Sequence, residues 1–340
     1  MQWKTLLILT LLAVLVFCYF TWKAQTMHLL NMPFAESLRS NSSYSVKTKE
    51  NNVKSFTGAK YHDNAEKPKV SLLRLTTSYP FPMINILGKV TDHQEKKYEL
   101  LSKDFAMFKR TLTDEDKAAT KKLLAKFLQV ANYSGVEYIM YGGTLLGSLR
   151  HHGMVPWDDD IDLWVSFTDR EKLKKTLGVL YPKYQYTEYS QRLKFYAKDG
   201  ITIRGYRWTF PFIDISFYRH SIHFIYDVDP GFAMDFRYPV SWIFPLVKRP
   251  FWEFMMLAPG NSRAVIEKNY KLDLCQTNSY NHKLEMNVFK VVSLKCDLLR
   301  EFIPFVYRKH QENGDVIEEL KLGDEILSTY TVYSTSEDRK

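Results

Sequence analysis

Four aspartates crowd a short stretch near the middle of the chain, and they are the side chains best suited to chemistry. Residues 141–165 read YGGTLLGSLRHHGMVPWDDDIDLWV and contain Asp158, Asp159, Asp160 and Asp162. In an extended segment, side chains two positions apart point the same way, so Asp160 and Asp162 repel each other without a counter-ion. A divalent cation bound through oxygen is the simplest counter-ion.

A further acidic position lies some fifty residues later, in residues 212–218, FIDISFY. In a strand its isoleucines face one way and Asp214 the other. If that strand neighbours residues 160–165, then Asp160, Asp162 and Asp214 form an oxygen site of the kind that Mg²⁺ or Mn²⁺ takes when it also holds a phosphate. The plainer alternative is that Asp214 is tied to Arg204 or Arg207.

Two other kinds of acidic site could in principle use the run at residues 158–162. A calcium-binding EF-hand loop is excluded, because Leu163 stands where its turn glycine is needed and Asp169 where its bidentate glutamate is needed. A glycosyltransferase Asp-x-Asp site stays open, since a nucleotide sugar needs the same metal. Asp158 and Asp159 stand beside the predicted metal pair, and either is a candidate for the general base.

The glycines before the acidic run predict a phosphate site. Gly142 and Gly143 allow a ligand to approach the backbone closely, and the N–H groups of the helix that opens at Thr144 would face a phosphate. Turn glycines before helices are also common without a ligand. Arg150, at the other end of that helix, is expected either to bind the donor phosphates or simply to sit favourably at a helix C-terminus.

Aromatic and histidine side chains complete the candidates for the donor site. His151 is a weaker candidate than Arg150, and Trp157 and Tyr141 are candidates for stacking on a base, with core packing as the alternative for each. Residues 275–282, CQTNSYNH, include a histidine. They are expected to form a disulfide-tethered surface loop, and the alternative is a loop over the active site.

The chain around these residues alternates helix and strand signals, which predicts an α/β (α+β) fold with a mixed sheet flanked by helices. Helices are expected over residues 114–132, begun by a capping box at Thr113, and over 144–151 with Gly153 as its cap, 169–180 capped by Thr168, 262–269 and 294–307. Strands are expected over residues 136–141, 160–165, 184–190, 193–197, 201–208 and 212–218, with a tight turn at Asp199-Gly200.

Charge and length place limits on function. The 340 residues carry a formal net charge of +9, spread over lysine-rich helices rather than gathered into one block. A solvated basic surface is therefore expected, and nucleic acid is not an expected partner.

The N-terminus carries an apolar run at residues 5–22 between Lys4 and Lys23. As a helix it would cover about 27 Å, enough to span a thin bilayer. An uncleaved signal anchor is favoured over a cleaved signal peptide. We expect a short cytoplasmic tail at residues 1–4, the anchor at 5–22, a luminal stem at 23–69, a catalytic domain at 70–328 with strand-like pieces at 70–75 and 80–87, and a flexible tail at 329–340.

A luminal location has further consequences in the sequence. N-glycosylation is expected at Asn41 and Asn132, which begin Asn-x-Ser sequons. Cys18 lies in the predicted anchor, so Cys275 and Cys296 are the remaining cysteines. They either form a disulfide or stay as two buried thiols. The predicted location is the Golgi or ER membrane, as a single-pass type II protein.

The motif GGTLLGSLRHHGMVPWDDDID closely resembles the signature of the LicD family, which includes phosphocholine transferases and proteins of the fukutin type. Residues 212–217 resemble the second acidic strand of that family, and residues 243–259 its next block, so the resemblance covers about residues 136–270. It implies a nucleotidyltransferase-like fold. It also implies that Gly142 and Gly143 bind the donor, that Asp160 and Asp162 bind the metal, and that Asp214 is the third acid.

The resemblance implies an activity as well. Family members move a phospho-alcohol, of the phosphocholine or alditol phosphate type, from a CDP-linked donor to a sugar hydroxyl. The expected partners are thus a CDP-linked donor and a glycan acceptor on a glycoprotein or glycolipid. A metal-dependent glycosyltransferase and a catalytically silent, glycan-binding or chaperone-like protein remain the alternatives.

Overall fold

The computed structural model describes residues 103–333. The predicted tail, anchor and stem, the strand-like pieces at 70–75 and 80–87, and the sequon at Asn41 lie outside these residues. Within residues 103–333, no helix is long and apolar enough to cross a membrane. Asn132 is exposed on the last turn of a helix, and its glycosylation stays a prediction.

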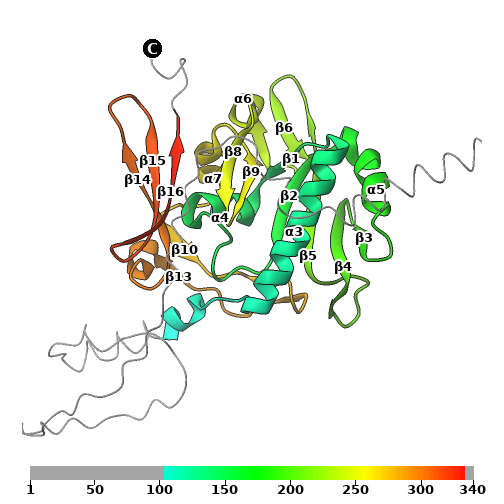
Figure 1. Cartoon of the computed structure of the whole chain (residues 1–340), viewed down its shortest axis with the longest axis horizontal. Helices are drawn as coiled ribbons and strands as arrows, with labels where there is room; N and C mark the ends of the chain where they lie inside the picture. Colours follow the sequence, from blue (N-terminus) through cyan, green and yellow to red (C-terminus); the bar gives the residue numbers. More distant parts are fainter. Residues whose placement is uncertain (1–102, 334–340) are drawn as a thin grey trace, which may run out of the picture.

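A seven-stranded mixed sheet forms the centre of the domain (Figure 1). The main strand order is β1-β2-β5-β4-β3, with β6 added to β5 and β7 added to β6. Strands β2 and β5 are parallel and the other pairs are antiparallel, which confirms the predicted mixed sheet. The strands are β1 Tyr138–Met140, β2 Ile161–Ser166, β3 Tyr184–Tyr189, β4 Arg192–Thr202, β5 Thr209–His220, β6 Phe224–Asp227 and β7 Arg237–Pro239.

The parallel pair brings the distant acids together. In the register of β2 and β5, Leu163 lies beside Ile215 and Asp162 lies beside Asp214. Because side chains alternate along a strand, the two apolar residues enter the core on one face and the two acids share the other. The predicted neighbourhood of these acidic strands is therefore confirmed.

Helices α3 (Asp114–Ser134) and α5 (Arg170–Gly178) cover the apolar face of the sheet. Phe127 of α3 is fully buried and meets Tyr138 edge-on, with 5.6 Å between ring centroids. Helix α3 begins as predicted, since the Thr113 hydroxyl accepts from the N–H of Asp116 and the Asp116 carboxylate accepts from the N–H of Thr113.

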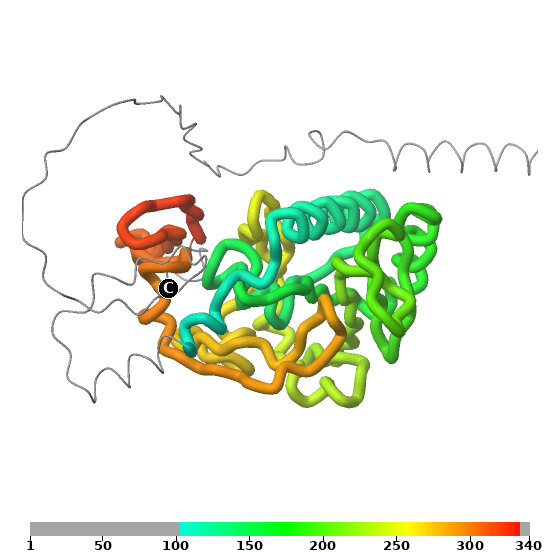
Figure 2. Tube along the Cα trace, turned by 90° about the horizontal axis from the view of Figure 1, so that it is seen from below, coloured from blue at the N-terminus to red at the C-terminus, as the bar shows by residue number. Residues whose placement is uncertain are grey.

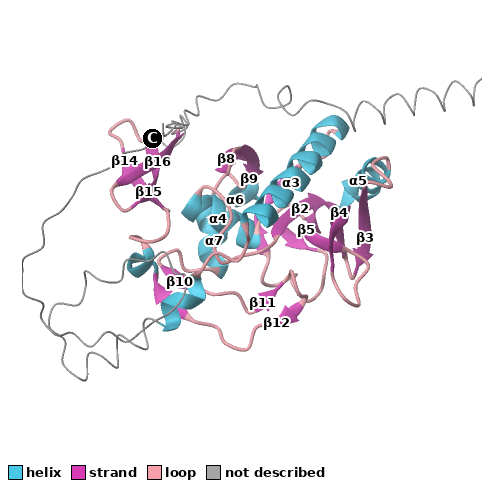
Figure 3. Ribbon diagram, turned by 60° about the horizontal axis from the view of Figure 1, so that its bottom comes forward, coloured by secondary structure: helices cyan, strands magenta, loops and turns pink. Residues whose placement is uncertain are grey.

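The other face of the sheet carries α4 (Gly142–His151), and the remaining elements lie beside it (Figure 3). Figure 2 shows the chain between α7 and β14, yellow to orange, running along one side of the molecule and back. These elements are α6 Val240–Ile243, the hairpin β8 Val247–Phe251 and β9 Phe254–Ala258, α7 Ser262–Asn269, the ladders β10 Leu274–Gln276 with β13 Ser293–Lys295 and β11 Tyr280–Asn281 with β12 Met286–Asn287, the sheet β14 Phe305–His310, β15 Val316–Leu322 and β16 Glu325–Val332, and the 3-10 turn η4 Cys296–Leu299. Two further 3-10 turns lie elsewhere: η2 Ala106–Phe108 precedes α3, and η3 Phe167–Asp169 joins β2 to α5.

Two helix caps and one turn differ from the predictions. The residue that ends α4 in the left-handed region is His152, with φ of 48°, and not Gly153. Helix α5 follows the turn η3 and its N-cap is Asp169 rather than Thr168. Gly200 does not make a turn, because β4 is one strand through it. A Cβ at Gly200 would lie 2.6 Å from Thr209 Oγ1, so the glycine allows the strands to approach closely.

The predictions for the C-terminal part were wrong in two places. No helix spans residues 294–307; this segment holds β13, η4 and the start of β14 instead. Cys296 is tied by a disulfide there, and Pro304 lacks the N–H that a helix would need. Residues 329–332, expected in a flexible tail, belong to β16 because each pairs with β15.

A buried ion cluster joins the C-terminal sheet to the rest of the domain. Glu318 of β15 is 2.7 Å from Arg249 Nη2 of β8 and 2.8 Å from Arg308 Nη2 of β14, and its Oε2 is 3.2 Å from His152 Nε2 at the end of α4. Burial alone would raise the pKa of Glu318, but the His152 hydrogen bond and the two arginines lower it to about 2.

Replacing Glu318 with glutamine is expected to destabilise the domain, because the buried Arg249 and the half-buried Arg308 lose their anion. We expect Glu318→Gln to lower the free energy of unfolding by about 3 kcal/mol at neutral pH. A depressed carboxyl pKa stabilises above the unfolded value of about 4.3, and this stabilisation is lost as the pH falls toward about 2. The difference between variant and wild type should therefore shrink below about pH 4.

Denaturant unfolding at several pH values measures this difference. The control is Glu325→Gln, the same change at an exposed residue of the same sheet. An equal loss of stability in both variants would contradict the conclusion that the ion cluster holds the C-terminal sheet against the rest of the domain.

Candidate active site

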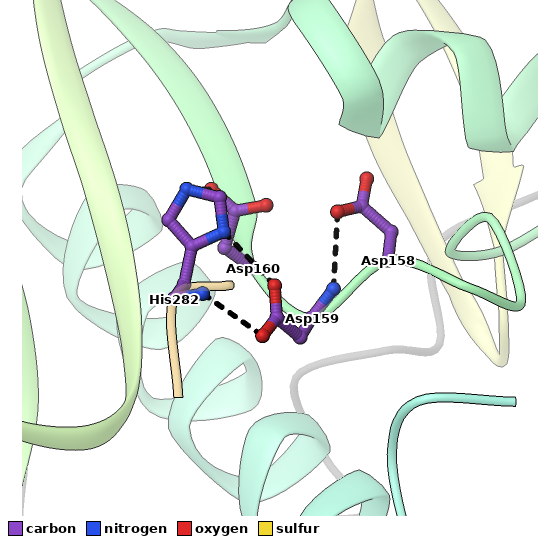
Figure 4. Close-up of side chains that lie close together, drawn as sticks. All are labelled: Asp158, Asp159, Asp160 and His282. Atoms are coloured by element: carbon purple, nitrogen blue, oxygen red, sulfur yellow. Dashed lines mark hydrogen bonds and ion pairs between the residues drawn. The ribbon is translucent and has the colours of Figure 1, made fainter. Parts of the chain in front are cut away.

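The acids form two overlapping groups at the end of β2. Oxygens of Asp160, Asp162 and Asp214 lie within 4.8 Å of one another, and ligand atoms of Asp158, Asp159, Asp160 and His282 do so as well. Figure 4 shows the second group, with the His282 ring against Asp159 and Asp160. The structure thus brings together all five aspartates that the sequence singled out.

Burying these carboxylates side by side makes their charged forms costly. Burial, followed by the charge of Asp214, raises the pKa of Asp162 to about 7. Burial and then the charge of Asp162 raise the pKa of Asp160 well above its ordinary value. Each pKa is raised because the ionised form lacks both water and a counter-ion. A bound cation would therefore stabilise the ionised form of these carboxylates.

The glycine pair makes room for the acids themselves. A Cβ at Gly142, whose φ is +54°, would lie 3.0 Å from Asp162 Oδ2, and one at Gly143 would lie 2.7 Å from Asp158 Oδ2. Both carboxylates therefore pack against the first turn of α4, where the helix dipole favours negative charge. Thr144 belongs to the same arrangement, since its Oγ1 accepts from the N–H of Asp162 at 2.7 Å.

Residues 276–292, which we call the cover loop, lie over the acids. A disulfide between Cys275 and Cys296 closes the loop at its base, so the predicted pairing, left open by the sequence, is present. Asn278 of the loop donates to Asp158 Oδ1 at 2.5 Å, and Lys283 Nζ is 2.6 Å from Asp116 of α3. The expected disulfide-tethered surface loop is confirmed, and the same loop also lies over the acids, which was the alternative.

His282 is the cover-loop residue most involved with the acids. Its Nδ1 is 2.9 Å from Asp159 Oδ1 and its Nε2 is 3.3 Å from Asp160 Oδ2. Burial lowers the pKa of His282, but Asp160 and the hydrogen bond with Asp159 outweigh burial and raise it to about 10. The imidazole is therefore a cation at neutral pH and offsets part of the negative charge.

The structure separates the two candidates for the general base. Asp159 accepts from the N–H groups of His282 and Lys283 at 3.0 and 3.1 Å and also meets the His282 ring, so it anchors the cover loop. Asp158 is held through Oδ1 by Asn278 and the N–H of Asp159. Burial, opposed by the Asn278 hydrogen bond and aided by the charge of Asp159, raises the pKa of Asp158. Both oxygens of Asp159 are thus engaged by the cover loop, which leaves Asp158 as the candidate for the general base.

Arg150 and Trp157, expected at the donor, hold the base of the cover loop instead. Arg150 Nη1 donates to the carbonyl of Leu274 at 3.1 Å and lies 3.5 Å from Cys296 Sγ. Trp157 is buried, and its Nε1 donates to the carbonyl of Gln276 at 2.8 Å. Arg150 Nη1 and Trp157 Nε1 are thus engaged with the backbone around the disulfide, whereas Arg150 Nε is buried without a hydrogen-bond partner.

His151 and Tyr141 are both packed in the core. Burial and the charge of Arg150 lower the pKa of His151 to about 3, so the ring is neutral, and its Nδ1 lies 2.7 Å from the carbonyl of Pro304. Tyr141 stacks on Trp164 with 5.4 Å between centroids. Core packing, the alternative given for Tyr141 and Trp157, is what the structure shows.

Asp214 is paired with a lysine that the sequence analysis missed. Lys194 of β4 lies 3.0 Å from Asp214 and 3.4 Å from Glu285 of the cover loop, so the alternatives Arg204 and Arg207 were wrong. Lys194 is directly opposite Asp214 in the register of β4 and β5. The antiparallel pairing of two predicted strands was the signal that could have found it.

A second cation on β4, Arg192, has no anionic partner. It shares a face with Lys194, its guanidinium carbon lies 4.0 Å from the Phe232 ring centroid, and no carboxylate among residues 103–333 comes within 4.0 Å of it. Its Nε is buried without a hydrogen-bond partner. Burial lowers the pKa of Arg192, but the surroundings, Asp162 and Asp214 among them, raise it more. Its charge is available to a bound anion.

The donor atoms of the three-acid group fit a hard divalent cation. Asp160, Asp162 and Asp214 offer only carboxylate oxygens, the ligands that Mg²⁺ and Mn²⁺ prefer. Asp214 is also buried, and the Lys194 ammonium lies 3.0 Å from its Oδ1. A bound divalent cation would therefore share Asp214 with Lys194.

Comparison with known proteins shows similarity over the central part of the chain. Residues 135–261 match the family model described as the LicD/FKTN/FKRP nucleotidyltransferase domain. The chain is 26% identical over 171 residues to ribitol 5-phosphate transferase FKRP of Mus musculus and of Homo sapiens, which covers 44% of this chain and 31% of each relative. The resemblance inferred from the sequence is confirmed.

A bacterial relative matches a shorter stretch. Lipopolysaccharide cholinephosphotransferase LicD of Haemophilus influenzae is 35% identical over 57 residues, which covers 17% of this chain and 22% of that protein. The chain thus spans about a third or less of the length of these curated relatives. The family match ends at residue 261, before the cover loop begins.

Adding a methyl group at Gly143 tests the packing of the acids on α4. The backbone of Gly143 is not left-handed, so Gly143→Ala changes only the space beside Asp158 Oδ2. We expect it to displace the carboxylate and lower the free energy of unfolding by about 1–2 kcal/mol. The control Gly178→Ala meets no atom within 4 Å and should raise stability by about 0.5–1 kcal/mol. Equal stability of both variants in urea would refute the close packing.

Removing one charge tests the cost of the buried acids. A carboxyl pKa raised in the folded state makes stability fall as the pH rises from about 4 through 7, after which it levels off. In metal-free protein, Asp162→Asn should therefore raise the free energy of unfolding by about 1–2 kcal/mol at pH 8 and by less at pH 5. The exposed control Asp199→Asn should change little. Stability lower than wild type at pH 8 would argue against repulsion in this group.

Proposed function

We propose that this protein, whose residues 135–261 match the family model described as the LicD/FKTN/FKRP nucleotidyltransferase domain, is a metal-dependent transferase of a phosphate-linked group. The donor is a CDP-activated alcohol, of the phosphocholine or alditol phosphate type, and the acceptor is a sugar hydroxyl of a glycan. The observation that carries the proposal is the set of three acids within 4.8 Å, with an unpaired arginine nearby.

Asp160, Asp162 and Asp214 would hold Mg²⁺ or Mn²⁺ in this proposal. Such an ion would supply positive charge to a bound diphosphate. Arg192 supplies the second positive charge, since its guanidinium has no carboxylate partner among the described residues. Guanidinium groups bind phosphate through paired N–H donors. His282 and Lys194 keep the surrounding acids partly neutralised.

Asp158 acts on the acceptor. Its raised pKa makes it a stronger base than an ordinary carboxylate, and Oδ1 is fixed by Asn278 and the N–H of Asp159. Asp158 takes the proton of the acceptor hydroxyl while that oxygen bonds to the phosphorus that carries the alcohol. The bond from this phosphorus to the bridging oxygen breaks, and CMP leaves with the electron pair.

The cellular setting is part of the proposal. We place the domain in the lumen of the Golgi or ER, anchored by the apolar run at residues 5–22 as a single-pass type II membrane protein. The disulfide between Cys275 and Cys296 supports an oxidising compartment. The expected acceptor is accordingly a glycan on a glycoprotein or glycolipid.

Calorimetric titration of the purified full-length protein with CDP, UDP and GDP in Mn²⁺ tests the donor class. We expect CDP to bind most tightly, and only with the metal present. Preference for UDP or GDP would favour a nucleotide-sugar glycosyltransferase. Binding of none of the three would favour a catalytically silent, glycan-binding protein.

A pair of variants assigns the binding to the acids. Asp160→Ala should weaken metal-dependent CDP binding by at least about a hundredfold, because it removes a carboxylate from both groups. Asp199→Ala removes an exposed carboxylate of β4 and should bind like wild type. Normal CDP binding by Asp160→Ala would show that the metal ligands lie elsewhere.

A further inference from the structure

A cavity of about 580 Å³ opens beside Asp158. Segments far apart in the sequence form its walls: the start of α3 and the residues before it, the loop from α4 to β2, the turn between β8 and β9, and β15 and β16. The volume lies within the range of roughly 300–1,000 Å³ that small-molecule sites have. Asp158 belongs both to this wall and to the acid cluster, so the cavity adjoins the proposed base.

The cavity wall carries more positive than negative charge. Its cations are Lys109, Arg110, Lys117 and Lys121, and its acids are Asp158 and Glu253. Lys121 pairs with Glu253 at 2.6 Å, and Arg110 pairs with Asp114 at 3.0 Å. Lys117 has no carboxylate within 4.0 Å among the residues that the structure describes. Burial, followed by the charges of Lys121 and Arg110, lowers its pKa. An anion near Lys117 would relieve this repulsion.

An aromatic ring lies beside two of the lysines of the cavity wall. Trp252, at the tip of the β8–β9 hairpin, has Lys117 Nζ 5.7 Å and Lys121 Nζ 5.6 Å from its ring. Its backbone is left-handed, with φ of 56°, a strained conformation for a bulky residue. A Cβ at Gly153 would lie 2.5 Å from its Cδ1, so the glycine leaves space for the ring. The left-handed backbone of Trp252 and the absence of a side chain at Gly153 together place the tryptophan ring at the cavity.

We propose that the cavity is the acceptor subsite and that it takes a sugar bearing a negatively charged group, a carboxylate or a phosphate. This inference rests on the proposed function, since it assigns the acceptor of that reaction. A sugar presents apolar C–H faces to a ring such as Trp252 and hydroxyls to a base such as Asp158. The charged group of the sugar then pairs with Lys117, whose ammonium lies beside the same ring.

Three disaccharides with one backbone test the proposal: one neutral, one ending in a hexuronate and one ending in a hexose 6-phosphate. Their binding to the purified full-length protein is measured by calorimetry. We expect at least one charged disaccharide to bind about fivefold more tightly than the neutral one. The ranking of the two charged forms identifies the anion. Equal binding of all three, or binding of none, would overturn the proposal.

Two lysine variants locate the preference. Lys117→Gln should remove most of the preference for charge, whereas Lys122→Gln, an exposed position of the same helix outside the cavity wall, should keep it. An unchanged preference in Lys117→Gln would also overturn the proposal. Titration of the same samples with CDP and Mn²⁺ separates the two hypotheses, because loss of CDP binding concerns the donor site and loss of charge preference concerns the cavity.

Discussion

Repulsion among buried carboxylates is the constraint on which the rest of the domain depends. Five aspartates share a small space, and burial with mutual repulsion raises the pKa of Asp158, Asp160 and Asp162. The surrounding structure offsets this cost from several directions. The first turn of α4 presents its dipole to two of the acids, and the cations of β4 and the cover loop lie against the others.

Two features allow so much charge to be gathered. The parallel pairing of β2 with β5 places acids from distant parts of the chain side by side, while their apolar neighbours fill the core beneath α3. The glycines of α4 then let two carboxylates approach a helix backbone more closely than any side chain would permit. The site is thus held by the sheet below it and by the disulfide-closed cover loop above it.

Short-range patterns in the sequence predicted the features that depend only on neighbouring residues. The capping box of α3, the alternation along β2 and β5 and the five acids follow from residue types and short spacings. The partners of the acids do not, because they are set by contacts between distant segments. The residue types of Arg150 and Trp157 suited donor binding, but in the structure both side chains bond to the base of the cover loop. Lys194 and His282 reach the acids only through strand register and a tethered loop.

The boundary of the family match divides the site in two. The acids, the glycine pair and Lys194 lie within residues 135–261, whereas the cover loop, residues 276–292, lies outside them and has its own disulfide tether. The loop meets the acids through Asn278 and His282, but it takes no part in the pairing of the sheet. The acids are therefore held by two parts of the chain under different physical constraints: strands whose positions are fixed by sheet pairing along their length, and a segment whose two ends are fixed by one covalent bond.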